Sequence, residues 1–277
     1  MRFPEPLLAA ILVLAAPAAF AGAEQVRSAL ATRLQATHPD LGPSELVLGP
    51  AAFDTALRDR PEWQSPAPGS AEVLAAGKAI WTRKFRNGRT LAQCFPNGGR
   101  RIAASYPQLD AKSRRVVTLE TAVNQCLKSH GEALLDPADP ATMGAVLAYL
   151  RSLSPGQKIT VRPANALAEE RFEQGRRLYF TRMGQQNHAC ATCHLQLAGR
   201  RYGDTPLPSA FGQAAGWPWL RGGKAVTLQM QARSCLERMG AAPFPAGSDE
   251  LAQVEYFLTA ISQGYALRPN GGRAALP

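Results

Sequence analysis

The chain has 277 residues, five cysteines and a formal net charge of +10. Its lysines and arginines are scattered along the sequence, which is typical of a solvated basic surface and disfavours a nucleic-acid-binding protein. After the N-terminus no stretch approaches 18 consecutive apolar residues, so the sequence predicts no membrane span.

The first residues are typical of a secretory signal peptide. Arg2 precedes an apolar run of about fifteen residues, and Ala19-Phe20-Ala21 is a small-residue cleavage pattern. We therefore assign residues 1–23 to a signal peptide, cleaved near Ala21 or Ala23. The exported chain is expected in the periplasm, where disulfides persist. Residues 24–70 are expected to form an N-terminal extension.

The remaining chain contains an internal repeat, which indicates a duplicated domain. Three matches occur in the same order in both halves, at offsets of about 98 to 109 residues. They pair "GKAIWTR" from Gly77 with "GRRLYFTR" from Gly175, "CLKSHGE" from Cys126 with "CLERMGA" from Cys235, and "AVLAYLRSLSPG" from Ala145 with "QVEYFLTAISQG" from Gln253. We predict domains at 71–156 and 168–277, joined by a linker at 157–167 that contains the helix breaker Pro163.

Each half is expected to close with an amphipathic helix. Apolar residues recur at helical spacing: Met143, Val146, Leu147, Leu150 and Leu153 in the first half, and Leu251, Val254, Phe257, Leu258 and Ile261 in the second. Asp139 with Pro140, and Ser248 with two following acids, are helix-start signals. Both halves also begin with a helical pattern that carries an aromatic residue, so the predicted fold class is all-α.

The segment "NHACATCHLQ" carries a haem-attachment motif, Cys190-Ala-Thr-Cys193-His194. In such a motif the two thiols bond covalently to the haem vinyl groups, and the histidine ligates the iron. A redox-active C-x-x-C motif would instead accompany alternating strands and helices, which the pattern lacks. We predict one covalently bound haem c, with His194 as proximal ligand, in the second of two tandem cytochrome c-like domains.

The first half has lost the matching residues. Aligning the halves places Leu91 opposite Cys190, Cys94 opposite Cys193, and Phe95 opposite His194. The N-terminal domain is therefore predicted to have lost its haem. Its remaining cysteines, Cys94 and Cys126, are expected to form a disulfide in an oxidising compartment. Closing a loop of about 33 residues would stabilise the fold by about 3–4 kcal/mol.

Three residues are candidates for the distal haem ligand. Met230, Cys235 and Met239 all lie downstream of the motif within range, and spacing alone does not separate them. Cys235 matches Cys126 in the first half, so this cysteine is common to both repeats. Met239 aligns with His130, whose imidazole is also a possible haem ligand, so Met239 remains a candidate. Met230 has no sulfur or nitrogen counterpart and is assigned to the core.

The motifs resemble those of the SoxA family, the catalytic cytochrome subunits of the SoxAX thiosulfate-oxidising complex. In the second half the similar segments are "YFTRMGQQNHACATCH", "WPWLR" and "RSCLERMGAAPFPAGSDELAQVEYFL". In the first half "NGRTLAQCFPNGGRRIAASYPQLD" and "VVTLETAVNQC" are similar to the single-haem branch of this family. The resemblance runs from about Ala71 to Ala266.

The resemblance implies an enzyme, an L-cysteine S-thiosulfotransferase. Such a subunit pairs with the small haem protein SoxX and joins thiosulfate oxidatively to a cysteine of the carrier SoxY, in SoxYZ. Its electrons pass to haem and then to an electron-accepting cytochrome c. The presence of a small accessory subunit in the complex is left open. The resemblance makes Cys235 the distal ligand and catalytic residue, as thiolate or persulfide.

The substrate-binding arginine departs from the family pattern. Many relatives carry an arginine four residues before the active cysteine, where this chain has Gln231. Arg233 is the nearest replacement and is our candidate for binding the thiosulfate anion, with Arg221 and Arg238 behind it.

Two other functions stay open. In a plain electron-transfer cytochrome, Met239 would be the distal ligand and Cys235 a buried small hydrophobe. A haem-based sensor would bind haem without turnover. His38 and His188 are expected at the surface.

Overall fold

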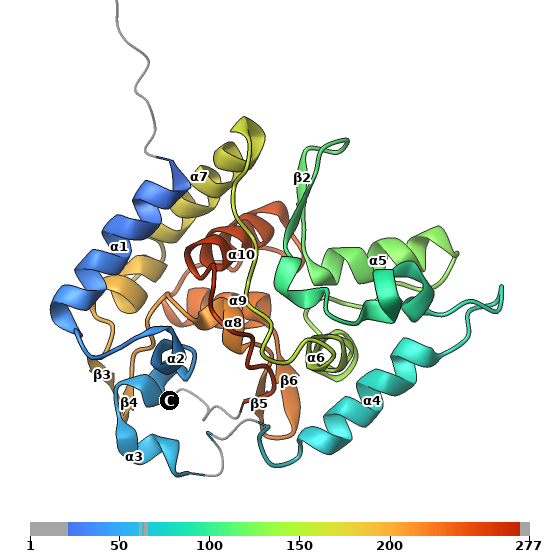
Figure 1. The fold of residues 1–277 in the computed structure, drawn as a ribbon, viewed down its shortest axis with the longest axis horizontal. Helices are drawn as coiled ribbons and strands as arrows, with labels where there is room; N and C mark the ends of the chain where they lie inside the picture. The colour runs from blue at the N-terminus through green and yellow to red at the C-terminus, as the bar shows by residue number, and fades with distance from the viewer. Residues whose placement is uncertain (1–21, 61–62, 64–65, 272–277) are drawn as a thin grey trace, which may run out of the picture.

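The computed structural model of the chain describes residues 22–60, 63 and 66–271. Nearly all of the signal peptide expected at 1–23 lies outside the described residues. Two helical domains lie side by side (Figure 1), and the second carries the N-terminal helix α1 on its outer face. None of the described helices is long and apolar enough to cross a membrane.

The elements of the two halves follow the same order. The first half contains α4 (Ser70–Thr82), η3 (Leu91–Cys94), η4 (Pro96–Gly99), η5 (Ala103–Ser105), β1 (Gln108–Asp110), β2 (Arg115–Val117), α5 (Leu119–Ser129), η6 (Pro140–Gly144) and α6 (Ala145–Ser152). The second contains α7 (Ala166–Phe180), η7 (Thr192–Gln196), β3 (Arg201–Tyr202), β4 (Thr205–Pro206), α8 (Gln213–Gly216), β5 (Trp219–Arg221), β6 (Lys224–Val226), α9 (Leu228–Arg238) and α10 (Asp249–Ile261). The predicted all-α, duplicated cytochrome c-like fold is confirmed. The structure adds short antiparallel hairpins, β1–β2, β3–β4 and β5–β6.

Matching glycines bring the first and last helices of each half together. A Cβ atom on Gly77 of α4 would lie 2.0 Å from the carbonyl oxygen of Ala145 in α6. A Cβ atom on Gly175 of α7 would lie 2.0 Å from the carbonyl oxygen of Gln253 in α10. Any side chain at either position would push the helices apart. The repeated glycine in the sequence is therefore the contact point of each helix pair.

Side-chain caps begin the helices that match between the halves. Thr118 caps α5, and Thr227, at the matching position, caps α9. Ser248 caps α10 by accepting a hydrogen bond from the backbone N–H of Leu251, as its sequence signal predicts. These caps satisfy helix N–H groups that would otherwise lack partners.

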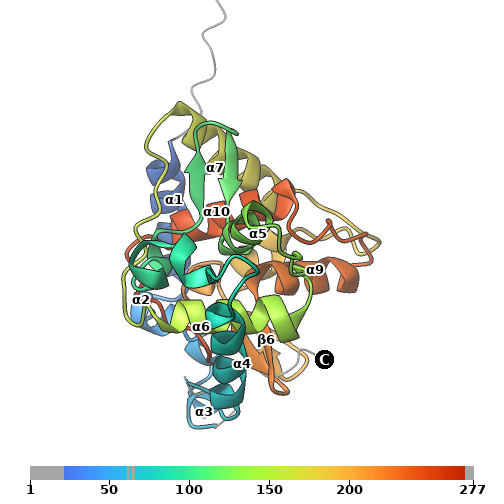
Figure 2. The ribbon, with the colours of Figure 1, turned by 90° about the vertical axis from the view of Figure 1, so that its right-hand side faces the viewer.

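The two halves pack reciprocally. Strand β2 of the first half contacts α10 of the second, where Arg115 forms an ion pair with Asp249 at 2.8 Å. Strand β6 of the second half contacts η6 and α6 of the first. Figure 2 shows the β1–β2 hairpin reaching toward α10. Each hairpin thus contacts the closing helix of the other half.

A buried arginine holds the interface between the halves. Arg151 of α6 is 2% exposed, and its guanidinium lies 4.0 Å from the ring centre of Trp217. It donates hydrogen bonds to the backbone carbonyl oxygens of Trp217, Ala214 and Ala215. These bonds compensate part of the cost of burying its charge.

Two buried carboxyl groups lie near this arginine. Glu120 of α5 and Glu255 of α10 are 0% and 2% exposed. Gln229 of α9 donates a hydrogen bond to Glu255 at 2.9 Å. Burial raises the pKa of both carboxyl groups, while the positive charge of Arg151 lowers each. The interface therefore favours protonated carboxyl groups.

The N-terminal extension packs on the second half. It consists of α1 (Ala23–Thr37), α2 (Pro43–Leu46), η1 (Gly49–Ala52) and α3 (Thr55–Arg58), and α1 lies against α7 and α10. His38, expected at the surface, is half-buried: its ring packs on Phe53, and Nε2 lies 3.1 Å from the carbonyl oxygen of Ala198. The sequence does not predict this burial, because the partner of His38 lies 160 residues away in the chain.

The segment predicted as a linker is held by hydrogen bonds to residues 265–267. Ile159 and Val161 are buried in the core. The N–H of Ile159 donates to the carbonyl oxygen of Tyr265, and the N–H of Leu267 donates to that of Gln157. The linker therefore adds core contacts between the halves.

Candidate haem and active site

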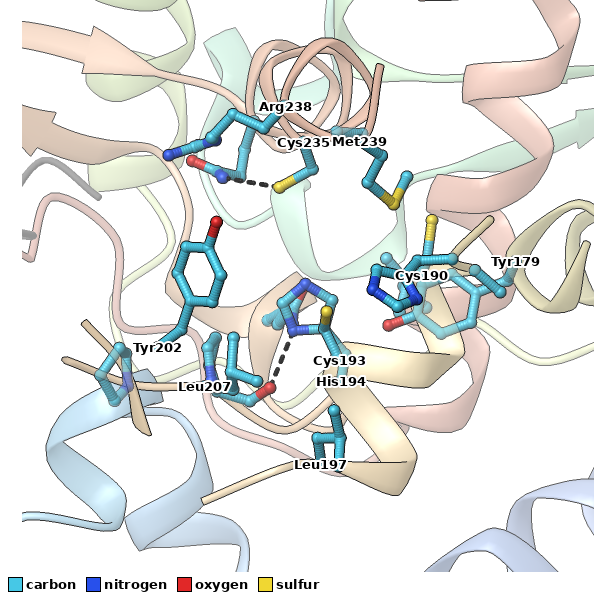
Figure 3. Close-up of a pocket in the computed structure, with 18 of the residues that line it drawn as sticks. Tyr179, Cys190, Cys193, His194, Leu197, Tyr202, Leu207, Cys235, Arg238 and Met239 are labelled. Carbon is cyan, nitrogen blue, oxygen red and sulfur yellow. Dashed lines mark hydrogen bonds between the residues drawn. The ribbon is translucent and has the colours of Figure 1, made fainter. Parts of the chain in front are cut away.

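A pocket in the second half brings together the haem-motif residues and the cysteine of α9 (Figure 3). Cys190, Cys193 and His194 lie on one side, and α9 forms the other with Cys235. Most of the remaining wall is apolar, with contributions from Tyr179, Leu197, Leu207, Leu228, Val254 and Leu258. The extension also contributes Pro50 and Trp63. No pattern in the sequence indicates that the extension would reach this pocket.

The ring of His194 is oriented by a backbone carbonyl. Its Nδ1 atom lies 2.8 Å from the carbonyl oxygen of Pro208 and 3.0 Å from the amide nitrogen of Gln213. A carbonyl oxygen can only accept, so Nδ1 carries the proton and donates it to Pro208. Nε2 is then the ring nitrogen that can lose its proton and bind a metal. This arrangement is typical of metal-ligating histidines.

Cys235 faces His194 across the pocket (Figure 3). The amide nitrogen of Gln231 donates a hydrogen bond to its sulfur at 3.1 Å. Burial raises the pKa of the thiol, but hydrogen bonding and charge interaction with His194, then Gln231 and Arg238, lower it to about 7. The site therefore favours a thiolate at this position, which is the form that binds metals.

The two methionine candidates are placed differently. Met239 ends α9 and lines the pocket, but its side chain points toward Cys190 and not toward His194 (Figure 3). Met230 lies outside the pocket lining, and its sulfur lies 3.5 Å from the backbone nitrogen of Thr227. Cys235 is therefore the sulfur best placed to oppose His194.

The arginines near Cys235 are not placed as the order of candidates from the sequence predicts. Arg233 donates a short hydrogen bond to the carbonyl oxygen of Phe244 and is absent from the pocket lining. Arg238, one helical turn beyond Ser234, lines the pocket and donates to that serine's hydroxyl at 3.1 Å. Sequence proximity to Cys235 favoured Arg233, but the direction of its side chain takes it to the loop after α9.

Polar atoms at the pocket are available to a ligand that carries polar groups at its edge. Among the described residues, Tyr179 Oη, His188 Nδ1 and Gln231 Oε1 are buried without a hydrogen-bond partner. His188, expected at the surface, lines the pocket. Burial raises the pKa of Cys190 to about 12, so this thiol is neutral in an apolar wall. An apolar pocket with two thiols, an oriented imidazole and an opposing sulfur fits haem c.

In the first half, a disulfide and a buried aromatic ring occupy the positions that match the haem-motif residues. Cys94 and Cys126 form a disulfide with a Cα–Cα distance of 6.0 Å. Phe95, which aligns with His194, is buried against Trp81 with ring centres 5.1 Å apart. His130 lies close to the disulfide, but the two sulfurs bind each other.

Comparisons with known proteins agree with this architecture. The model of the SoxA/TsdA cytochrome c domain family matches residues 76–159 and 174–267. The L-cysteine S-thiosulfotransferase subunit SoxA of Chlorobaculum tepidum is 33% identical over 84% of this chain and 81% of its own length. The subunit of the same name from Allochromatium vinosum is 32% identical over 93% of this chain and 92% of its own length.

A solved structure shows the same fold. The structure described as SoxXA from P. pantotrophus matches with a TM-score of 0.66 and 25% sequence identity. The match covers 73% of this chain and 78% of that one. The two family segments coincide with the two halves of the internal repeat. Both the matched domains and the relatives at 32–33% identity lead to one conclusion: this chain belongs to the SoxA family, within the SoxA/TsdA cytochromes.

Proposed function

We propose that this chain is the catalytic subunit of a periplasmic thiosulfate-oxidising complex, with L-cysteine S-thiosulfotransferase activity. It would couple thiosulfate oxidatively to a cysteine of the carrier SoxY. Relatives named for this activity support the proposal. The observation that carries it is Cys235, whose sulfur faces His194 across the pocket. An electron-transfer protein has no need of a thiol there.

The cofactor of this site would be one haem c. Cys190 and Cys193 would hold it covalently, and His194 and Cys235 would ligate its iron from opposite sides. Bound haem supplies an electron acceptor that takes one electron at a time. The first half, with Phe95 and a disulfide at the matching positions, would hold none. We keep the domain limits of 71–156 and 168–277, and the structure's packing supports adding residues 24–58 to the second.

The chain's own residues would position the reacting sulfur. Gln231 holds the sulfur of Cys235 by a hydrogen bond, and α9 keeps both residues on one face, four positions apart. The coupling joins the outer sulfur of thiosulfate to the carrier's cysteine sulfur. The carrier thiol loses its proton to solvent, and two electrons leave for the electron acceptors. Because two electrons leave, a second haem on a partner subunit is chemically natural.

The partner would be the small cytochrome SoxX, since the matching solved structure is described as a SoxXA complex. The signal peptide predicted at 1–23 supports export to the periplasm. SoxYZ and an electron-accepting cytochrome c would be transient partners, and a small accessory subunit stays open.

Replacing Cys235 by methionine tests the function. We expect Cys235→Met to keep haem, because a thioether also ligates iron, and to abolish thiosulfate-dependent reduction in the presence of SoxYZ. Met239→Leu is the matched control and should keep both. Retained coupling in Cys235→Met would remove this cysteine from the mechanism. Loss of the distal ligand in Met239→Leu, seen by electron paramagnetic resonance, would favour the electron-transfer cytochrome instead.

A further inference from the structure

The first half has a hollow of its own, and the disulfide lies in its wall. Cys94 and Cys126 both line this hollow, and polar side chains such as Gln93, Gln108 and Ser129 form much of the rest. A small molecule or ion that enters the hollow therefore reaches the two sulfurs. The chemistry of this disulfide is not used by the haem site of the second half.

A histidine lies beside the two sulfurs. One ring nitrogen of His130 and the sulfurs of Cys94 and Cys126 all lie within 4.8 Å of one another. Among the described residues, no other group of three cysteine, histidine or acidic side chains comes close enough together to hold a metal ion. Cys126 is buried, whereas Cys94 and His130 are partly exposed. The three side chains therefore form a compact set that solvent and ions can reach.

The imidazole of His130 is held in position by its own helix. Its Nδ1 atom lies 2.9 Å from the carbonyl oxygen of Cys126 and 2.9 Å from the hydroxyl oxygen of Ser129. The ring also packs on Phe85, with ring centres 5.2 Å apart. Metal-ligating histidines are usually oriented by a hydrogen bond of this kind. An ion bound here would meet a ligand that is already ordered, which lowers the entropic cost of binding.

The donor set favours zinc over the harder divalent ions. Asp110 is the acidic residue among the described residues that line the hollow. Its carboxylate already accepts hydrogen bonds from the hydroxyl of Ser113 at 2.6 Å and from the backbone N–H of Lys112 at 3.0 Å. Two sulfurs and an imidazole remain as ligands. Thiolate and imidazole suit Zn²⁺, whereas Mg²⁺ and Ca²⁺ need oxygen ligands.

We infer that Cys94, Cys126 and His130 form a Zn²⁺ site when the disulfide is reduced. A dithiol reductant supplies two electrons and two protons: the bond between Cys94 and Cys126 breaks, and the two sulfurs of the reductant join in a disulfide. Zn²⁺ then replaces both thiol protons, which pass to solvent, and water takes the fourth position. The proposed attachment of haem to Cys190 and Cys193 also needs free thiols, so a reductant of this class must act on the chain before haem is bound.

The disulfide and the metal ion would hold the same two elements together. Cys94 ends η3, Cys126 lies in α5, and His130 follows the last residue of α5. Bound Zn²⁺ would therefore cross-link η3 to α5 in the reduced protein, as the disulfide does in the oxidised protein. The first half would keep a cross-link at its centre in both redox states. This role is separate from the coupling of thiosulfate.

Zinc titration of the full-length, haem-loaded protein tests the inference. A phosphine reductant opens the disulfide without adding a competing thiol, and Cys235→Met is used as the background because it removes the remaining free cysteine. We expect the reduced protein to bind one Zn²⁺ per chain at least about 100-fold more tightly than the untreated protein, because only free thiols can become ligands. Equal binding before and after reduction would overturn the inference.

Histidine variants on the same background test the third ligand. We expect His130→Gln to weaken Zn²⁺ binding by the reduced protein about tenfold or more, since even the residues that orient metal ligands contribute that factor. His38→Gln changes the half-buried histidine of the extension and should bind as the parent protein does. An unchanged Kd in His130→Gln would exclude this ligand set.

X-ray absorption at the zinc edge identifies the ligands without depending on any variant, and the haem iron does not contribute at this edge. We expect two sulfur neighbours at about 2.3 Å and a nitrogen neighbour at about 2.0 Å in the reduced wild-type protein. Nitrogen and oxygen neighbours alone would mean adventitious surface binding and would refute the site. None of these outcomes bears on the proposed function, because coupling of thiosulfate requires no zinc.

Discussion

The two halves share one framework and differ at its centre. In both, a glycine lets the first helix contact the last, and a threonine caps the helix that carries a cysteine. At the centre, the second half has His194 and Cys235 facing across an open pocket. The first half has Phe95 packed on Trp81 and the cysteine of its helix in a disulfide.

The framework therefore does not depend on the haem-motif residues. Helix crossings, caps and hairpins lie outside the pocket, so they persist when the ligands change. In the first half, a bulky aromatic ring fills the centre and a disulfide cross-links it. The second half has a pocket for a cofactor at the matching place. The following variants test whether the two centres are independent.

Removing the haem-motif thiols should abolish covalent haem. We expect no covalently bound haem in the double variant Cys190→Ala/Cys193→Ala, because no thiol is left to bond its vinyl groups. The matched control, Cys94→Ala/Cys126→Ala, removes the two cysteines of the other half and should keep one haem per chain. Mass spectrometry under denaturing conditions counts the haem. Haem loss in the control would show that the two centres are coupled.

Removing the disulfide should cost stability without touching the haem spectrum. The bridge joins two cysteines that are 32 residues apart in the sequence. Its loss should therefore lower the free energy of unfolding by about 3–4 kcal/mol. Urea denaturation of Cys94→Ala/Cys126→Ala against wild type measures this change. The visible spectrum reports the haem ligands and should stay the same. A shifted spectrum would mean that the disulfide also shapes the haem pocket.

The glycine contacts should be equally intolerant in both halves. Gly77→Ala and Gly175→Ala each place a Cβ atom 2.0 Å from a backbone oxygen, so each helix pair must move apart. We expect each to lower the free energy of unfolding by about 3 kcal/mol, the upper end for overpacking. Only Gly175→Ala should also reduce haem content, because α7 and α10 line the pocket through Tyr179 and Val254. Equal haem loss in Gly77→Ala would contradict this.

The buried carboxyl groups predict a pH effect at the interface. Glu120 aligns with Gln229 of the other half, so Glu120→Gln makes the two positions alike. Burial raises the pKa of Glu120 above its ordinary value of 4.5, so the folded state keeps a proton that the unfolded state releases. Its contribution to stability is thus complete below pH 4.5 and is lost as pH rises through the folded-state pKa.

We therefore expect Glu120→Gln to flatten the fall of stability above this pH, by at most about 1.4 kcal/mol per pH unit. Thermal unfolding at a series of pH values measures the slope. Glu72→Gln, which changes an exposed carboxyl group on α4, should leave the slope as in the wild type. A steeper slope in Glu120→Gln would reverse the assigned direction.

Local patterns in the sequence determined much of this protein. The C-x-x-C-H motif indicates the haem residues, because attachment needs those groups at that spacing. The repeat and the helical periodicity predicted two matching all-α halves, and the loss of a thiol and a histidine predicted a pairing of Cys94 with Cys126. Each depends on residues close in sequence or on comparing two copies, so each is visible without a structure.

The contacts between distant side chains depend on how the helices pack. Spacing left Met239 and Cys235 open as the residue opposite His194, and nearness in sequence favoured Arg233, whereas Arg238 lines the pocket. The direction of each side chain on α9 separates these candidates. The packing of the extension on the second half and the burial of Glu120 against Glu255 arise in the same way. Such contacts join elements far apart in the chain, and their geometry exists only once the helices have packed.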